Sequence, residues 1–155
     1  MTTFNRLPLA ELDRISVVLP FLCIGSYGAA EQADYLEGLG ITNTICLLEE
    51  LPKAIPPQFE NLLLPMSDDG ESRLADLLVR AVPFIERARS SGGRVLIFCA
   101  SGINRSPALA SAYLQVVLRY RMDAALSMIF SVRPLVSIHE RYLDQLAVLP
   151  KELPT

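Results

Sequence analysis

The sequence predicts an α/β fold: a three-layer domain in which helices flank a central, mostly parallel sheet of about five strands. Short apolar runs alternate with helical patterns over the first two thirds of the chain, and only helical patterns follow. This alternation is typical of parallel strands joined by helices. The chain has 155 residues, of which 51% are hydrophobic and 20% charged, a composition sufficient for one domain with a buried core.

The first part of the chain predicts two short strands and a helix. Residues 15–19 and 21–24 are apolar runs separated by Pro20, which cannot donate to a ladder, so we place both near a sheet edge. Residues 25–28 predict a turn. Residues 29–39 combine helix-forming residues with apolar side chains at helical spacing, and glycines end the pattern.

The middle of the chain predicts two further strands and a long helix. Residues 41–48 form an apolar run typical of an inner strand, and three prolines make residues 49–59 a loop. Residues 61–64 predict a strand, and residues 67–72 predict an acidic, turn-prone loop. Residues 73–89 carry apolar side chains on one helical face, with an internal proline that should kink or split the helix.

The last third of the chain predicts one strand and three helices. Residues 94–99 predict a buried strand. Residues 108–120 predict a helix, and Pro107 suits its first turn, where no N–H is needed. Further helices are predicted at residues 122–132 and 138–149.

No linker, repeat or low-complexity tract divides the chain. We therefore expect one domain over residues 14–150, preceded by a lead-in at residues 1–13 and followed by a tail at residues 151–155. The N-terminus lacks a signal-peptide pattern, and no apolar run approaches the roughly 20 residues of a membrane helix. We expect a cytoplasmic protein, with a nuclear location also open, that is monomeric and does not bind membranes.

Charge and residue counts argue against several partners. The net charge of −3 gives no electrostatic reason to expect nucleic acid. The three cysteines are an odd and sparse set, which indicates reduced thiols rather than a disulfide framework. With one histidine and no Cys-x-x-Cys, the sequence offers no zinc site, so we expect neither a metal nor another cofactor.

Residues 99–106 predict an anion-binding loop that contains a nucleophile. A buried strand that feeds a tight loop and a helix N-terminus leaves backbone N–H groups pointing into the loop. These groups favour a thiolate at Cys99, and the planar fork of Arg105 can hold two oxygens of a phosphate at once. The hydroxyl of Ser106 is placed to stabilise the leaving thiolate in a second step. The phosphate-binding residues between the cysteine and the arginine are Ala100, Ser101, Gly102, Ile103 and Asn104.

The spacing Cys-x5-Arg is weak by itself, and the alternative is a core cysteine that ends a strand before an ordinary turn. The other two cysteines show this background, because Cys23 and Cys46 have Ala29 and Pro52 at the position of the arginine. The prediction becomes specific because the strand, the cysteine, the glycine, the arginine, the serine and the helix all fall in register.

The stretch Cys99-x5-Arg105-Ser106 resembles the signature of the cysteine-dependent protein tyrosine phosphatases, and most closely that of the compact (atypical) dual-specificity phosphatases. Other segments are similar to landmarks of that family: Phe21-Leu22-Cys23-Ile24-Gly25-Ser26, Leu64-Pro65-Met66-Ser67-Asp68 and Arg133-Pro134. The resemblance implies that residues 14–150 are a tyrosine phosphatase-like catalytic domain of the dual-specificity type. It also implies hydrolysis of phosphotyrosine and phosphoserine or phosphothreonine in phosphoprotein substrates, through a phosphocysteine intermediate.

The resemblance further implies a general acid in the acidic loop. The leaving oxide is a poor leaving group, so a carboxylic acid must protonate it, and the same carboxylate can then take a proton from the attacking water. The family's pattern favours Asp68, with Asp69 as the next candidate and Glu71 after it. The alternative is that this cluster is a solvated acidic turn.

Four residues depart from the family signature or lie outside it. The family has histidine before the nucleophile, and this chain has Phe98, which cannot donate a hydrogen bond. We therefore expect low activity, and higher activity after replacement by histidine, provided that the loop accepts an imidazole. Cys46 is interpreted as a buried strand cysteine, with a redox role as a resolving cysteine as the alternative. Arg133 is interpreted as structural, and His139 as a surface or helix-start residue.

Two other functions stay open. The first is a pseudophosphatase that binds phosphoproteins without turnover, which Phe98 favours and which the intact Cys99 and Arg105 argue against. The second is an RNA 5′-phosphatase, because Asn104 before the arginine resembles the loop of those enzymes, although Pro107 and the acidic composition do not fit. The uncharged loop makes a phosphoinositide substrate a poor fit.

Overall fold

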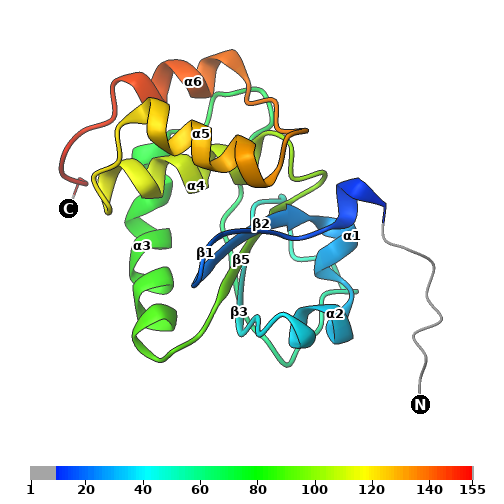
Figure 1. Cartoon of the computed structure of the whole chain (residues 1–155). Helices are drawn as coiled ribbons and strands as arrows, with labels where there is room; N and C mark the ends of the chain where they lie inside the picture. Colours follow the sequence, from blue (N-terminus) through cyan, green and yellow to red (C-terminus); the bar gives the residue numbers. More distant parts are fainter. Residues whose placement is uncertain (1–9, 155) are drawn as a thin grey trace.

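The computed structural model describes residues 10–154, which contain a single five-stranded sheet between two layers of helices (Figure 1). The strands are β1 (Ser16–Leu19), β2 (Leu22–Ser26), β3 (Asn43–Cys46), β4 (Glu60–Leu63) and β5 (Val95–Cys99). Their order is β1-β2-β5-β3-β4, in which β1 runs antiparallel to β2 and all other neighbours are parallel. The predicted fold class is therefore confirmed.

The helices divide between the two faces of the sheet, as Figure 1 shows. They are α1 (Tyr27–Ala30), α2 (Ala33–Gly38), α3 (Leu74–Ser90), α4 (Arg105–Val116), α5 (Met122–Val132) and α6 (Glu140–Ala147), preceded by the 3-10 helix η1 (Glu11–Asp13). Side chains alternate along β5. Leu96 and Phe98 belong to the apolar cluster beneath α1 and α2, whereas Val95 and Ile97 belong to the larger core beneath α3 to α6.

Helix α4 is the central element of the larger layer. Ten of its twelve residues are buried, and it contacts α3, α5 and α6 as well as β2 and β5. A helix whose whole circumference is apolar or small can be packed on all sides in this way. The residues at the N-terminus of α4 are consequently fixed relative to the sheet.

The predicted turn at residues 25–28 and the bounds of the predicted helix at residues 29–39 are wrong. β2 continues through Ser26, α1 begins at Tyr27, and α2 follows after a break. Ser26 caps α1, because its Oγ accepts a hydrogen bond from the N–H of Ala29 at 3.1 Å. The cap starts the helix two residues earlier than the apolar spacing indicates.

The sequence predicts that Pro83 kinks or splits α3, and because α3 is continuous from Leu74 to Ser90, the splitting alternative is wrong. Proline lacks the N–H that would bond to the carbonyl four residues earlier, which is that of Val79. Val79 is 37% exposed, so water can satisfy its carbonyl on the solvent side of the helix. Pro107 lies in the first turn of α4, as predicted.

The two ends of the chain are described only in part. The predicted lead-in, residues 1–13, falls mostly outside the described residues, and its described part contains η1. The last residue of the predicted tail, residues 151–155, lies outside them as well. Within residues 10–154, no helix has the length and apolar character needed to cross a membrane.

Candidate active site

The loop from Cys99 to Ser106, which the sequence predicts to bind phosphate and which is called the phosphate-binding loop below, lies at the carboxyl end of the central strand β5. The parallel strands β2 and β3 flank β5, and this edge of an α/β sheet is where ligands commonly bind. Gly102 has a φ angle of 72°, and a Cβ at this position would lie 2.8 Å from the backbone carbonyl carbon of Gly25. The loop can therefore close this tightly only with glycine at position 102.

The Cys99 sulfur lies among backbone N–H groups. Its Sγ accepts hydrogen bonds from the N–H of Gly102 at 3.3 Å and from that of Ser106 at 3.4 Å. Ser106 Oγ lies 3.5 Å from the same sulfur and 3.5 Å from the carbonyl oxygen of Gly25. Because N–H groups at a helix N-terminus carry partial positive charge, the sulfur lies in an electropositive environment.

Arg105 is the first residue of α4, and its side chain is only 13% exposed. Its Nη1 donates to the carbonyl oxygen of Met66 at 3.3 Å, and its Nε lies 3.4 Å from Asp68 Oδ1 without the alignment of a hydrogen bond. Among residues 10–154, no group hydrogen-bonds this buried Nε. A buried guanidinium N–H without a partner is costly, and an oxygen of a bound phosphate can supply that partner.

The acidic loop that follows β4 brings Asp68 to the phosphate-binding loop. Asp68 Oδ1 accepts a hydrogen bond from Asn104 Nδ2 at 2.8 Å and lies beside Arg105, and the side chain is 70% exposed. The structure thus brings together Cys99, Arg105, Ser106 and Asp68, the four side chains to which the sequence assigned chemistry.

The other two acidic candidates face elsewhere. Asp69 Oδ1 accepts the backbone N–H of Glu71 at 3.0 Å, within its own turn. A hydrogen bond from the Ser67 hydroxyl, together with that N–H, lowers the pKa of Asp69. Glu71 forms an ion pair with Arg141 at 3.1 Å. Neither carboxylate contacts the phosphate-binding loop through these bonds.

The interpretation of Arg133 as a structural residue is confirmed, and the structure adds that this side chain holds the phosphate-binding loop. Its side chain is 2% exposed, and it follows α5 in a stretch that the sequence marks only by Arg-Pro. Its five N–H donors match five acceptors: Gly102 O at 2.8 Å, Ser101 O at 3.0 Å, Leu12 O at 2.6 Å, Arg14 O at 2.6 Å and Ser16 Oγ at 3.2 Å. In a trans peptide the C=O and N–H point in opposite directions, so holding the Ser101 carbonyl outward aims the Gly102 N–H at the Cys99 sulfur.

Phe98 and Cys46 lie on the opposite face of the sheet from α4. Phe98 has no exposed surface and belongs to the apolar cluster that also contains Leu96 and Phe59. Cys46 is paired in register with Phe98 and belongs to the same cluster, and burial raises the pKa of its thiol. His139 is the N-cap of α6, so its interpretation as a helix-start residue is confirmed.

A comparison with known families gives the decisive observation. The family model described as "Dual specificity phosphatase, catalytic domain" matches residues 22–151. The chain belongs to the dual specificity phosphatase family. The predicted family is thereby confirmed, and the phosphate-binding loop and the acidic loop both fall inside the matched residues of this dual specificity phosphatase domain.

Relatives and solved structures agree with this assignment. Dual specificity protein phosphatase 1-A of Xenopus laevis is 32% identical over 139 residues, which are 90% of this chain and 38% of that protein. The chain therefore spans well under half the length of the curated relatives it matches. Human DUSP28 has a TM-score of 0.79 at 28% identity, over 85% of this chain and 89% of that chain. A mouse protein assigned as a dual specificity phosphatase, complexed with zinc tungstate, has a TM-score of 0.81 at 28% identity. The match covers 93% of this chain and 90% of that chain.

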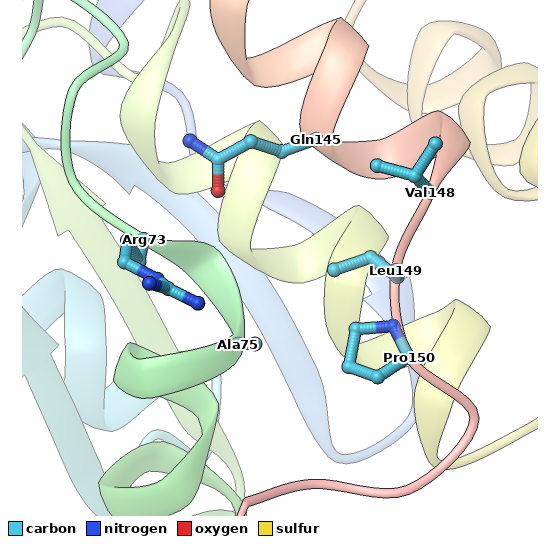
Figure 2. Close-up of a pocket in the computed structure, with 6 residues that line it drawn as sticks. All are labelled: Arg73, Ala75, Gln145, Val148, Leu149 and Pro150. Atoms are coloured by element: carbon cyan, nitrogen blue, oxygen red, sulfur yellow. The ribbon is translucent and has the colours of Figure 1, made fainter.

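A separate cavity of about 240 Å³ lies between the start of α3 and the end of α6 (Figure 2). It is lined by Arg73, Ala75, Gln145, Val148, Leu149 and Pro150. None of these residues belongs to the phosphate-binding loop. Gln145 links the cavity to the acidic loop, because its Nε2 donates to the carbonyl oxygens of Gly70 at 3.2 Å and Ser72 at 2.7 Å.

Proposed function

We propose that this dual specificity phosphatase domain hydrolyses phosphotyrosine and phosphoserine or phosphothreonine in proteins. The proposal rests on one observation at the phosphate-binding loop. The Cys99 sulfur accepts hydrogen bonds from two backbone N–H groups, and the buried Nε of Arg105 in the same loop has no hydrogen-bond partner among the described residues. A nucleophile and an oxyanion-binding group at one site are what transfer of a phosphoryl group to the enzyme requires.

The first step transfers the phosphoryl group to the enzyme. The Cys99 thiolate attacks phosphorus, the S–P bond forms as the bond to the leaving oxygen breaks, and Asp68 gives its proton to that oxygen. Arg105 and the N–H groups of the loop bind the equatorial oxygens, on which the charge is spread. The alcohol or phenol then departs.

The second step regenerates the enzyme. The Asp68 carboxylate takes a proton from water, the water oxygen attacks phosphorus, and the S–P bond breaks to release phosphate and the thiolate. The Ser106 hydroxyl, 3.5 Å from the sulfur, can donate to the thiolate as it leaves. Over both steps one ester and one water become one alcohol and one phosphate, and no metal or other cofactor takes part.

The structural relative in complex with tungstate supports oxyanion binding as part of this proposal. Tungstate is a tetrahedral oxyanion with a shape similar to that of phosphate.

Phe98 supports a slow rate of hydrolysis, because no imidazole is present behind the nucleophile to support the loop. We also infer that the domain works as a monomer.

The alternative of an RNA 5′-phosphatase has less support. Asn104 suggested it, and the amide of Asn104 is already engaged by Asp68 and by the backbone N–H of His139. It is therefore not free to bind a nucleotide. The pseudophosphatase alternative rests on Phe98 alone, and a turnover measurement decides it.

The experiment measures turnover of p-nitrophenyl phosphate and of phosphotyrosine and phosphothreonine peptides by the wild type and by Cys99→Ser. We expect turnover by the wild type and none by the variant, which still binds vanadate or tungstate because the N–H groups and Arg105 remain. Anion binding without turnover by the wild type would support the pseudophosphatase instead. Turnover of 5′-triphosphate RNA that exceeds turnover of the peptides would support the RNA 5′-phosphatase.

A further inference from the structure

Asn104 joins three separate segments of the protein. Its Nδ2 donates to Asp68 Oδ1 at 2.8 Å and to the Asp68 carbonyl oxygen at 3.0 Å. Its Oδ1 accepts the backbone N–H of His139 at 2.6 Å. The phosphate-binding loop, the acidic loop and the start of α6 therefore meet at one side-chain amide.

The contact with His139 determines which end of the amide faces Asp68. A backbone N–H can only donate, so it pairs with the amide oxygen, and the amide nitrogen then points the other way. The donor itself is fixed, because His139 caps α6 and its Nδ1 accepts the N–H of Arg141 at 3.0 Å. The Asn104 nitrogen is thus aimed at the acidic loop before any substrate binds.

Asp68 depends on this contact because the rest of its surroundings is solvent. Its side chain is 70% exposed, and its other contact within residues 10–154 is the ion pair with Arg105 Nε at 3.4 Å. When a phosphoryl group occupies the loop, Arg105 must turn its donors to the phosphoryl oxygens. Asp68 then needs a different partner to stay beside the leaving oxygen, and Asn104 is in place to supply it.

We propose that Asn104 is a positioning residue for the general acid: it holds the Asp68 carboxyl group beside the phosphate-binding loop during phosphoryl transfer. This inference rests on the proposed function. It has a specific consequence, because acid assistance matters for a poor leaving group and matters little for a good one. The fall in kcat/KM on removal of Asn104 should therefore depend on the leaving group, whereas the fall caused by general damage to the loop should not.

The first test compares kcat/KM for phenyl phosphate, a poor leaving group, with kcat/KM for p-nitrophenyl phosphate, a good one. For Asn104→Ala we expect a loss of about 10-fold on phenyl phosphate and a value near that of the wild type on p-nitrophenyl phosphate. Asn104→Asp keeps the size of the side chain but places two carboxylates together, so its loss on phenyl phosphate should be larger. Gln58→Ala, which removes an exposed amide bonded to Glu37 at 3.2 Å, is the matched control and should change neither value. Equal losses on both esters would overturn the proposal.

The second test places Asn104→Ala in an Asp68→Ala background. If Asn104 acts through Asp68, its removal costs nothing further on phenyl phosphate once the carboxyl group is gone. A further loss of about 10-fold would mean that Asn104 acts independently of the acid, and this result would overturn the proposal.

Amide hydrogen exchange separates failure of this inference from failure of the proposed function. Asn104→Ala and Asn104→Asp should both speed exchange at residues 67–72 and leave α3 unchanged, whether or not the protein turns over. If the wild type hydrolyses neither ester, the proposed function fails, and the exchange result alone decides whether Asn104 holds the acidic loop. Unchanged exchange at residues 67–72 in both variants would overturn the positioning role.

Discussion

At the scale of single residues, Asp68 and Asp69 are neighbours with different chemistry. Asp69 accepts the backbone N–H of Glu71 within its own turn, and hydrogen bonds from Ser67 and from that N–H lower its pKa. Asp68 contacts Asn104 and Arg105 instead. We predict that Asp68→Ala lowers kcat/KM for phenyl phosphate about 100-fold, and that Asp69→Ala leaves it close to that of the wild type. Steady-state kinetics of the two variants checks this, and similar losses in both would contradict the assignment.

Phe98 offers a second prediction at this scale. It is completely buried among apolar side chains, so an imidazole N–H at this position would lack a partner at a cost of about 1–3 kcal/mol. We expect Phe98→His to lower the melting temperature by roughly 3–9 °C. Where the variant is still folded, we expect no gain in turnover, because an imidazole N–H without an acceptor in this apolar cluster cannot support the loop. Phe98→Leu is the apolar control and should not raise turnover. A histidine variant as stable as the wild type would show that the imidazole finds a partner.

At the scale of elements, Arg133 connects the phosphate-binding loop to η1 and β1. We predict that Arg133→Lys lowers kcat/KM about 10-fold on every ester, whatever its leaving group, because lysine keeps the charge but has three donors for five acceptors. The same kinetics on phenyl and p-nitrophenyl phosphate checks this. Arg87→Lys, on α3 at an exposed ion pair with Glu60, is the control. A loss restricted to phenyl phosphate would instead place Arg133 with the acid.

The sequence predicted those features that depend on residues close together in the chain. The β5 run, the glycine at position 102 and the arginine six residues after Cys99 are adjacent in the chain, so their arrangement follows from short-range geometry. The contacts that complete the site are long-range: Arg133 is 121 residues from Leu12, and Asn104 is 36 residues from Asp68. No periodicity relates residues so far apart, and only packing of the folded chain brings them together. The start of α1 differs from the prediction for a smaller reason, because Ser26 caps the helix within residues that predict a turn.

At the scale of the whole molecule, stability should depend on pH through buried thiols. Burial raises the pKa of Cys23 from 9.0 to about 11, so between these values the unfolded chain loses a proton that the folded chain keeps. The contribution of Cys23 to the free energy of unfolding is therefore fully present below pH 9. It falls by about 2 kcal/mol as the pH rises toward 11. Urea denaturation at a series of pH values measures the fall, and Cys23→Ala should reduce it. Part of the fall should remain in that variant, because the pKa values of Cys46 and Tyr113 are also raised. A fall unchanged by Cys23→Ala would contradict this attribution.

The burial of α4 on nearly every side also limits how this domain can be redesigned. A helix with ten of its twelve residues inside the core tolerates few substitutions, and the nucleophile and the arginine are attached directly to its first turn. Random mutagenesis aimed at this helix should mainly yield unfolded protein. Libraries that seek new substrate preferences belong at exposed positions of the acidic loop other than Asp68, such as Asp69 and Glu71, where sequence can vary without disturbing the core.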